Sequence, residues 1–403
     1  MLIVQKFGGT SVGDVERIQN VADRVSKCKE DGNDVVVVVS AMSGETNKLV
    51  GFAEHFSSNP PKAEMDMLLS SGERVTASLL AIALTEMGHD AISMTGRKAG
   101  IITDVVHTKA RIEEINPKAM QSAIKDGNII VVAGFQGVSI DGHVTTLGRG
   151  GSDLSAVAIA GALNADLCEI YTDVSGIYTT DPRIEPKAKK LDNISYDEML
   201  ELASLGAKVL QNRSVELAKK LNVNLVTRTS FSYEEGTLIT KEENIMEKPL
   251  VSGIALDKNQ ARISLMGVKD RPGIASDIFG RLADNDVNID MIIQNKAHDG
   301  TTNIDFTVPM GDLSEAKAVV DLFVDSGDIV ADSYNDHICK VSIVGVGMKS
   351  HTGVAAKAFA TMADKNININ MISTSEIKVS MVIDEQHANL AVQSLHKAYE
   401  LDK

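Results

Sequence analysis

An internal repeat in the C-terminal part of the sequence constrains the fold more than any other feature. The segment Ile263–Val268 reads ISLMGV, and Val341–Val346 reads VSIVGV. The offset between the copies is 78 residues here and 80 residues from Gly273 and Gly353 onward. Each copy has the pattern strand, glycine turn, helix, strand, strand, helix. The repeat therefore predicts two copies of one small α+β domain.

The second copy lacks a strand that the first copy has. Residues 329–331 can end the first copy as a strand, whereas the last helix, expected over 385–401, is followed only by Asp402 and Lys403. The strand-like run 250–256 precedes the first copy. We expect residues 250–256 to complete the second copy, so that the two copies interleave in sequence.

The first 240 residues alternate apolar runs with helical patterns. Val35–Val39 is apolar on both faces, which is typical of a central parallel strand covered by helices on both sides. Residues 129–135 and 168–172 have the same character, and a helix is expected over 73–87. The order predicts a doubly wound, mainly parallel α/β domain that binds ligands beyond the carboxyl ends of its strands.

Length and charge restrict the class of protein. A chain of 403 residues is too long for one core. We expect an α/β domain at residues 1–240, a charged linker at 241–249, and the repeat copies at 250–335 and 336–403. The net charge of −15 argues against nucleic acid or an anionic membrane as the main partner. The three cysteines lack metal-ligand spacing, so we expect a cytoplasmic protein without a metal held by a side-chain cluster.

The first loop of the α/β domain has the composition of a phosphate site. The strand at residues 2–7 delivers Lys6 and is followed by Gly8 and Gly9. Glycines let main-chain N–H groups approach an anion, and Lys6 supplies a compact positive charge. The spacing is not that of a P-loop. For this segment alone, an ordinary strand–turn–helix connection is an equally good explanation.

A second glycine-rich loop precedes an Ala-rich helix that we expect over 154–163. It reads GRGGSD from Gly148 to Asp153. Arg149 offers two parallel donors to a carboxylate or phosphate, and free N–H groups at a helix N-terminus bind anions. Asp153 either offsets the helix dipole or orients a magnesium ion beside polyphosphate.

Three other features carry weaker signals. The loop Thr172–Arg183 is either a surface hairpin or a nucleotide pocket, with Tyr178 facing a base and Arg183 reaching phosphate. Lys208 is either a phosphate partner or a solvated lysine. Glu73 is expected in the first turn of a helix, where it either stabilises the helix dipole or receives the ammonium group of an amino acid.

These motifs together resemble those of the aspartate kinase family, which has the amino acid kinase fold. The matching segments read KFGGTSV at 6–12, SGER at 71–74 and GRGGSD at 148–153, with the loop 172–183. The two C-terminal copies resemble paired ACT domains, which are ferredoxin-like α+β regulatory folds. The resemblance covers essentially the whole chain. It implies transfer of the ATP γ-phosphoryl group to the β-carboxylate of L-aspartate, giving 4-phospho-L-aspartate and ADP, the first step towards lysine, threonine and methionine.

The resemblance also implies roles for individual residues. A carboxylate acceptor is already ionised, so the chemistry needs positive charge and alignment rather than a general base. We assign charge stabilisation to Lys6 and the organisation of magnesium and phosphates to Asp153. The residues expected to bind aspartate are Ser40, Thr46, Glu73, Arg149, Gly150 and Ser152. The residues expected to bind ATP are Lys6, Phe7, Gly8, Gly9, Thr172, Asp173, Tyr178, Arg183, Lys208 and Val209.

A control site is expected in the ACT pair. The turn Asp270–Ala275 opens a helix whose free N–H groups suit an amino-acid carboxylate. Without the resemblance, Asn288 and Asn368 read as simple turn residues. With it, lysine or threonine is expected to bind. The expected effector residues are Asp270, Gly273, Ile274, Ala275, Asn288, Ile289, Asp290 and Gln294 in the first copy, and Val354, Ala355, Asn368, Ile369, Ser375 and Glu376 in the second.

Two other functions remain open at this point. Another amino acid kinase could act on glutamate, acetylglutamate, carbamate or UMP, although the ACT pair and SGER disfavour it. A catalytically silent amino-acid sensor is disfavoured by the intact set of Lys6, Arg149 and Asp153. We expect ATP with Mg²⁺, L-aspartate, and lysine or threonine or both as ligands, in a homo-oligomer formed through the ACT domains. A shorter product started at Met246 would contain both ACT copies and every strand they need.

Overall fold

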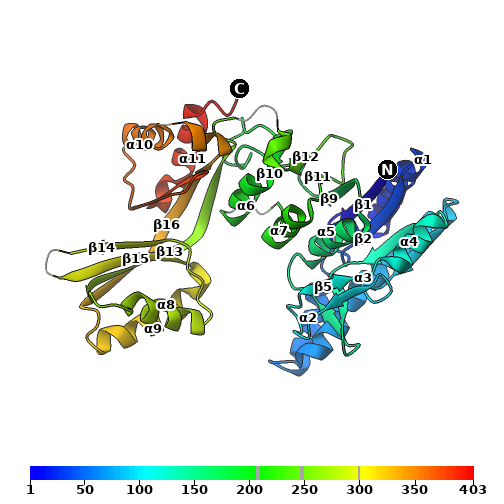
Figure 1. The fold of residues 1–403 in the computed structure, drawn as a ribbon, viewed down its shortest axis with the longest axis horizontal. Coiled ribbons are helices and arrows are strands. Elements are labelled where there is room, and N and C mark those ends of the chain that lie inside the picture. The colour runs from blue at the N-terminus through cyan, green and yellow to red at the C-terminus, as the bar shows by residue number, and fades with distance from the viewer. Residues whose placement is uncertain (206–208, 246–248, 298–299, 352) are drawn as a thin grey trace. The chain divides into compact units, whose positions relative to one another are not determined.

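The computed structural model describes residues 1–205, 209–245, 249–297, 300–351 and 353–403 (Figure 1). Within these ranges the chain forms two compact units. The first unit contains residues 1–177, 190–204 and 209–245. The second contains residues 178–189, Leu205 and the described part of 249–403.

An eight-stranded sheet forms the centre of the first unit. Its order is β10 (Asn193–Ser195), β12 (Thr237–Thr240), β11 (Leu225–Thr229), β9 (Leu167–Thr172), β1 (Leu2–Phe7), β2 (Asp34–Val39), β6 (Ile129–Ala133) and β3 (Ala91–Met94). All neighbouring strands are parallel except β11 and β12. A doubly wound, mainly parallel sheet was predicted from the apolar runs, and this prediction is confirmed.

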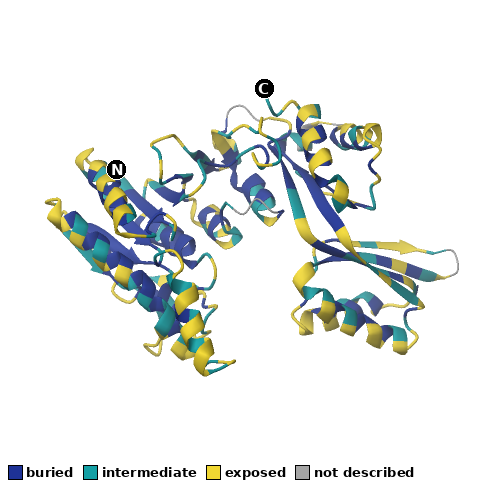
Figure 2. Cartoon of the chain, turned by 180° about the vertical axis from the view of Figure 1, so that it is seen from behind, coloured by how far each residue is buried: buried dark blue, intermediate teal, exposed yellow. Residues whose placement is uncertain are grey.

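Helices cover both faces of this sheet. On one face, α1 (Val15–Glu30) and α3 (Lys62–Glu86) pack against β2 and β6, and on the other α5 (Gly151–Leu163) packs against β1, β2 and β9. The sheet is mostly buried, while the helices expose their outer sides (Figure 2). The remaining helices of this unit are α2 (Glu45–Phe56), α4 (Lys118–Lys125), α6 (Tyr196–Ser204), α7 (Asn212–Leu221) and the 3₁₀ turn η1 (Glu242–Asn244).

A smaller four-stranded sheet lies in the same unit. Its order is β5 (Ile112–Ile115), β4 (Ile101–Thr103), β7 (Gln136–Ser139) and β8 (Val144–Thr146). β7 begins directly after the turn at Gly134 and Phe135 that ends β6, and β8 leads into the loop that starts α5. The small sheet therefore determines where the second glycine-rich loop begins.

Helix α3 differs from its prediction. A helix was expected over 73–87 with Glu73 in its first turn, but α3 begins at Lys62, so Glu73 lies in the middle of the helix. In the sequence, Gly72 and the two serines before it are typical of a helix start. In the structure, Gly72 packs closely against Ala41, and a Cβ at this position would collide with the Ala41 side chain. α3 is the one described helix that is long and apolar enough to cross a membrane, a property that core helices share. Glu73 lies in the buried middle of α3 and not in its first turn. The expectation that Glu73 stabilises the helix dipole is therefore wrong.

The second unit contains one six-stranded antiparallel sheet. Its order is β14 (Ile292–Lys296), β15 (Thr301–Pro309), β13 (Gly253–Lys269), β16 (Ala331–Val344), β18 (Lys378–Asp384) and β17 (Met371–Thr374). The helices are α8 (Ile274–Asp284), α9 (Leu313–Asp325), α10 (Val354–Asp364) and α11 (Ala388–Ala398), with 3₁₀ turns η2 (Met310–Asp312), η3 (Val346–Ser350) and η4 (Glu385–His387).

Two long strands run through both repeat copies (Figure 1). Residues 253–257 of β13 pair with residues 340–344 of β16, and residues 262–266 pair with residues 331–335. The register shifts between Asp257 and Arg262, where the strand passes from one copy to the other. Each copy has its own core, one around Ile263 and Phe306 and one around Ile254 and Val341.

A short segment from the first half of the sequence packs in the second unit. The Thr179 carbonyl accepts a hydrogen bond of 2.7 Å from the Ile254 N–H. The Thr179 hydroxyl lies 2.9 Å from Nε2 of buried His396. Ile184 packs against the same core. The expected division at residue 240 therefore does not coincide with the division by contacts, which gives residues 178–189 to the second unit.

Candidate active site

A cavity of about 460 Å³ lies at the carboxyl ends of strands in the first unit. The loops after β1, β2 and β6, the middle of α3 and the start of α5 line it. This is where a parallel sheet with helices on both faces is expected to bind ligands. It brings together ten of the predicted residues, namely Lys6, Gly9, Ser40, Thr46, Glu73, Arg149, Gly150, Ser152, Asp153 and Asp173.

Lys6 and Asp153 form an ion pair at the base of the cavity. Lys6 Nζ lies 2.5 Å from Asp153 Oδ1, and the two side chains are 11% and 12% exposed. Each of the two charges is thus offset by the other in a site with little access to water.

Glu73 presents a second buried carboxylate to the cavity. Its side chain is nearly inaccessible, and Oε1 accepts a hydrogen bond of 3.1 Å from the Ala41 N–H. Oε2 is buried and has no partner among the residues that the structure describes. Burial raises the pKa of Glu73 to about 7, because the charged form loses its hydration. A bound ammonium group would satisfy Oε2 and favour the ionised carboxylate.

The second glycine-rich loop needs its glycines for both conformation and space. Gly148 and Gly150 have φ values of 76° and 74°, which side chains rarely adopt. A Cβ on Gly150 would lie 2.1 Å from the Gln211 side chain, and one on Gly151 would lie 2.9 Å from the Phe135 ring. The loop is therefore closely packed, and it exposes Arg149 on the cavity wall.

The first glycine loop brings main-chain groups to the same cavity. A Cβ on Gly8 would lie 3.3 Å from Lys6 Nζ, and one on Gly9 would lie 3.0 Å from the Ala41 carbonyl. The Phe7 ring instead stacks on Tyr171 in the core, with ring centroids 4.5 Å apart. Phe7 can therefore contribute only its main chain to a ligand.

Several residues expected to bind ATP do not line this cavity. The Thr172 hydroxyl donates to Asp173 at 3.0 Å. Arg183 makes bonds of 2.7–3.1 Å to the Asp181 carboxylate, and this contact lowers the pKa of Asp181. Tyr178 and Arg183 belong to the segment that packs in the second unit.

One further residue expected to bind ATP lies near the start of α7. Val209 is half-buried in the turn ahead of this helix. The predicted phosphate partner Lys208 lies outside the described residues, as does the expected internal start at Met246.

Phe135 and the turn Ala41–Gly44 also line the cavity, although they were not among the predicted site residues. Phe135 has a φ of 68°, which is strained for a residue other than glycine. Its N–H donates to Ser155 Oγ at 3.1 Å and its carbonyl accepts from Leu147. The turn 41–44 follows the predicted strand 35–39, which was the signal that could have identified it. Phe135 was expected inside the strand 129–135, whereas β6 ends at Ala133 and leaves Phe135 in the turn that follows.

Some of the expected effector residues lie at two related turns of the second unit, where α8 and α10 begin. The others follow these helices: 288–290 lie between α8 and β14, which contains Gln294, 368–369 lie between α10 and β17, and 375–376 lie between β17 and β18. Gly273 and Gly353, with φ values of 94° and 95°, precede α8 and α10 in the same way. The Asp270 carboxylate is 2.9 Å from Lys296 Nζ, and buried Lys340 pairs with Asp290.

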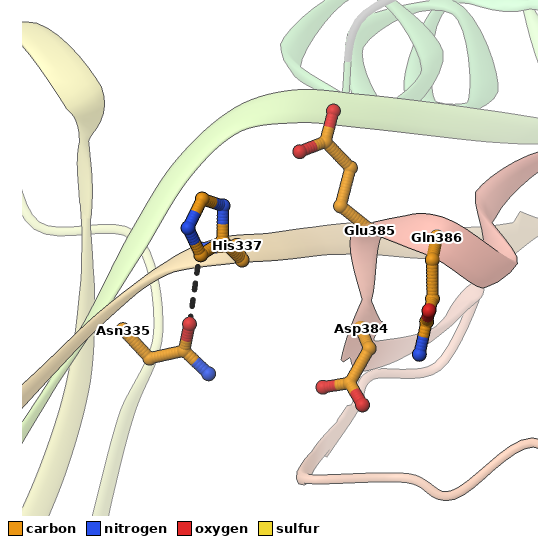
Figure 3. A pocket seen from close by; sticks show the side chains of 5 residues that line it. All are labelled: Asn335, His337, Asp384, Glu385 and Gln386. Carbon is orange, nitrogen blue, oxygen red and sulfur yellow. Dashed lines mark hydrogen bonds between the residues drawn. The ribbon is translucent and has the colours of Figure 1, made fainter.

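A separate cavity of about 570 Å³ in this unit is lined by Asn335, His337, Asp384, Glu385 and Gln386 (Figure 3). These side chains come from β16 and from the end of β18 and η4. None of them is an expected effector residue.

Comparisons with known proteins agree with this arrangement. Residues 1–227 match the amino acid kinase family, and residues 262–325 and 341–399 each match the ACT domain. The aspartokinase of Helicobacter pylori is 58% identical over 407 residues, covering 100% of both chains. Escherichia coli aspartokinase III in complex with aspartate and ADP has a TM-score of 0.80 at 26% identity, covering 99% of both chains. The same enzyme in complex with lysine and aspartate has a TM-score of 0.79 at 26% identity, covering 98% of this chain and 99% of that chain.

The resemblance inferred from the motifs is thus confirmed over the whole chain. The eight-stranded α/β unit corresponds to the amino acid kinase match, and the six-stranded sheet corresponds to the two ACT matches. The chain belongs to the aspartate kinase family, phosphotransferases that transfer the γ-phosphoryl group of ATP to the β-carboxylate of L-aspartate.

Proposed function

We propose that the 460 Å³ cavity is the site where this chain phosphorylates L-aspartate. One observation carries the proposal: the ion pair of Lys6 and Asp153 shares a cavity with the orphaned oxygen of Glu73 and the exposed Arg149. An ammonium-binding carboxylate, a carboxylate-binding guanidinium and a phosphate-binding lysine are the groups that this reaction requires. The E. coli enzyme named above was solved with aspartate and ADP, which supports the proposal.

Aspartate is held at its charged groups. Glu73 Oε2 receives the α-ammonium group, and Arg149 grips a carboxylate through its two parallel donors. The smaller groups around them complete the substrate site, namely Ser40, Thr46, Gly150 and Ser152.

Phosphoryl transfer requires little covalent chemistry from the protein. An oxygen of the ionised β-carboxylate attacks the γ-phosphorus as the bond to the leaving oxygen of ADP breaks, and an acyl phosphate forms. Two anions must be aligned and the charge of the transferring group must be offset. Lys6 supplies that charge, and the Gly9 amide adds a donor. The Gly8 N–H instead donates to the Tyr171 carbonyl at 3.3 Å. No histidine lines the cavity among the described residues, and none is needed as a base.

The residues present fit a magnesium ion that enters with ATP. Mg²⁺ prefers oxygen ligands, keeps several waters and binds through one or two carboxylates together with phosphates. The Asp153 carboxylate lines the cavity beside Lys6, so it offers oxygens of this kind next to the place proposed for the phosphates. When bound, the ion offsets phosphate charge. We assign the nucleotide to Thr172, Asp173, Tyr178, Arg183, Lys208 and Val209, together with the residues after β1.

We propose that the second unit controls this activity. The catalytic domain would be residues 1–240, with a linker at 241–249 and ACT domains at 250–335 and 336–403. The pairing of residues 253–257 with the second copy supports the assignment of this strand to the second ACT domain. Lysine, threonine or both would bind at the Gly273 and Gly353 turns, and the E. coli complex with lysine supports an amino-acid effector. We further propose a cytoplasmic homo-oligomer assembled through the ACT domains, with a shorter ACT-only product as a possible partner.

The test is ADP release from ATP with aspartate, glutamate, acetylglutamate, carbamate and UMP as alternative acceptors. We expect release only with aspartate, and inhibition by lysine, threonine or both. Release with another acceptor in preference to aspartate would contradict the substrate assignment. An absence of release with every acceptor would leave amino-acid sensing as the function.

A further inference from the structure

Helix α3 carries a second buried carboxylate that the proposed reaction does not use. The Asp66 side chain is 0% exposed and lies two helical turns before Glu73, on the same side of α3. Burying a carboxylate is costly unless hydrogen-bond donors satisfy it. The position of these donors therefore shows what Asp66 holds in place.

Three donors from two segments surround Asp66. The Thr146 hydroxyl donates to Oδ1 at 2.5 Å, and the Thr108 N–H donates to the same oxygen at 3.0 Å. His107 Nδ1 lies 2.7 Å from Oδ2. Thr146 is the last residue of β8, two positions before Gly148. Asp66 thus ties α3 both to the segment 107–108 and to the strand that leads into the Arg149 loop.

The segment 107–108 lies close to the first residue of the Arg149 loop. Thr108 has a φ of 67°, in the left-handed region that threonine rarely adopts. Its carbonyl oxygen lies 3.2 Å from the position that a Cβ on Gly148 would take. The hydrogen bond from the Thr108 N–H to Asp66 therefore stabilises a strained residue whose carbonyl faces the first glycine of the loop.

The other side of the loop is held by α7 and by apolar packing. Arg213 donates to the carbonyls of Leu147 and Ala110 at 2.9 and 3.3 Å. Ala110, Leu147 and Leu154 form a small buried cluster, and Leu154 directly follows Asp153. Among the described residues that hold the Arg149 loop in this way, Asp66 is the only buried carboxylate. A single substitution of Asp66 therefore removes more of these contacts than any other single change.

We propose that Asp66 is a positioning residue for aspartate binding. By holding Thr146 and Thr108, it fixes the Arg149 loop relative to α3, which also carries Glu73. One helix thereby sets the separation between the groups that grip the two charged ends of the substrate. This inference rests on the proposed roles of Arg149 and Glu73.

The test compares two neighbouring threonines of β8. Thr146→Val removes the hydroxyl that bonds to Asp66. Thr145→Val is a matched control, because Thr145 is equally buried and its hydroxyl bonds to Thr103 at 2.6 Å instead. Asp66→Asn is measured beside them. Steady-state ADP release by the full chain gives the KM for aspartate, the KM for ATP and kcat, and thermal melts record the stability of each variant.

We expect Thr146→Val and Asp66→Asn to raise the KM for aspartate by about 10-fold, because small displacements of substrate-positioning groups are costly in rate and binding. The KM for ATP should change by less than about threefold, and Thr145→Val should stay within about twofold of the parent. If Asp66→Asn fails to fold, Thr146→Val alone decides. Equal effects of Thr146→Val and Thr145→Val, or an unchanged aspartate KM in Thr146→Val, would overturn the inference.

Arg149→Ala separates this result from a failure of the proposed function. If Arg149→Ala raises the KM for aspartate and Thr146→Val does not, only the role of Asp66 is wrong. If neither variant changes that KM, the assignment of aspartate to this loop is wrong as well.

Discussion

Lys6 and Asp153 hold each other across the junction of β1 and α5, with Nζ and Oδ1 2.5 Å apart. Both charges are nearly buried, so each would be costly to leave without a partner. A phosphate oxygen that approaches Lys6 must compete with Asp153 for the ammonium group. A cation beside Asp153 would offset its charge and release Lys6 for that contact.

Replacement of Lys6 by alanine should abolish turnover with little loss of folding. The charge is needed mainly in the transition state, and loss of such a group costs on the order of 10³-fold in kcat. ADP release and a thermal melt measure the two effects. Lys29→Ala is a suitable control, because it removes another ion pair of the first unit, to Asp34 at 3.0 Å, without reaching the cavity. Retention of more than a tenth of the activity by Lys6→Ala would rule out its role.

Replacement of Arg149 by alanine should act on the substrate rather than on the chemistry. Loss of a bidentate contact to a carboxylate should raise the KM for aspartate by about 10-fold or more, with a smaller change in the KM for ATP. Arg149→Lys keeps the charge but not the fork, so we expect an intermediate value. An unchanged aspartate KM in both variants would place the substrate elsewhere.

The raised pKa of Glu73 predicts an unusual dependence of stability on pH. Its folded-state value of about 7 lies above the ordinary 4.5, so the folded protein holds this proton more tightly than the unfolded chain does. The parent should therefore lose stability as the pH rises from 4.5 to 7, by ~3 kcal/mol in total. Glu73→Gln cannot ionise and avoids this loss.

Thermal melts of parent and Glu73→Gln at pH 5 and pH 8, without ligands, test this prediction. The advantage of the Gln variant should be larger at pH 8 by several degrees, on the order of 2–4 °C per kcal/mol for a domain of this size. Aspartate should raise the melting temperature of the parent at pH 8 and not that of the variant. The same pH dependence in both proteins would show that Glu73 is not the titrating group.

Some elements could be predicted from the sequence because their local pattern has one interpretation. Val35–Val39 can only be a strand buried on both faces, and Gly148–Asp153 combines left-handed glycines with a helix start. Helix α3 was predicted too short because Gly72 lowers local helix propensity. The reason for a glycine at this position is its packing against Ala41, which the local sequence does not show. Phe135 was missed for a similar reason: tertiary contacts with Ser155 and Leu147 hold it in a strained conformation. The pairing of residues 178–189 with the second unit depends on contacts between distant segments, which no local pattern records.

A fragment of residues 246–403 should fold without the catalytic unit. It contains the buried residues of both cores of the second unit and all of β13, whose residues 253–257 complete the sheet of the second copy. It lacks residues 178–189 of that unit, including Ile184 at the edge of the second core. A fragment that starts at Ile263 lacks those residues, among them buried Ile254, and should be much less stable. Circular dichroism melts of the two fragments give the comparison. Equal cooperativity and equal melting temperatures would show that the strand is dispensable for both copies.

The last prediction concerns the expected effector site in the first ACT copy. Asp270→Ala and Gln294→Ala should each relieve inhibition by lysine or threonine while leaving the uninhibited kcat within about twofold, because neither residue lies in the catalytic cavity. Couplings between sites are typically worth about 1–3 kcal/mol, so loss of a direct effector contact should raise the inhibition constant by about 10-fold.

The Lys296 side chain supplies a control for Asp270, since the structure pairs the two at 2.9 Å. Lys296→Ala breaks the same ion pair but leaves the carboxylate that is expected to bind the effector. Relief in Asp270→Ala without relief in Lys296→Ala would support direct binding, whereas equal relief would mean that the ion pair itself matters. If Asp270→Ala and Gln294→Ala remain as sensitive as the parent to both amino acids, the effector does not bind at this turn.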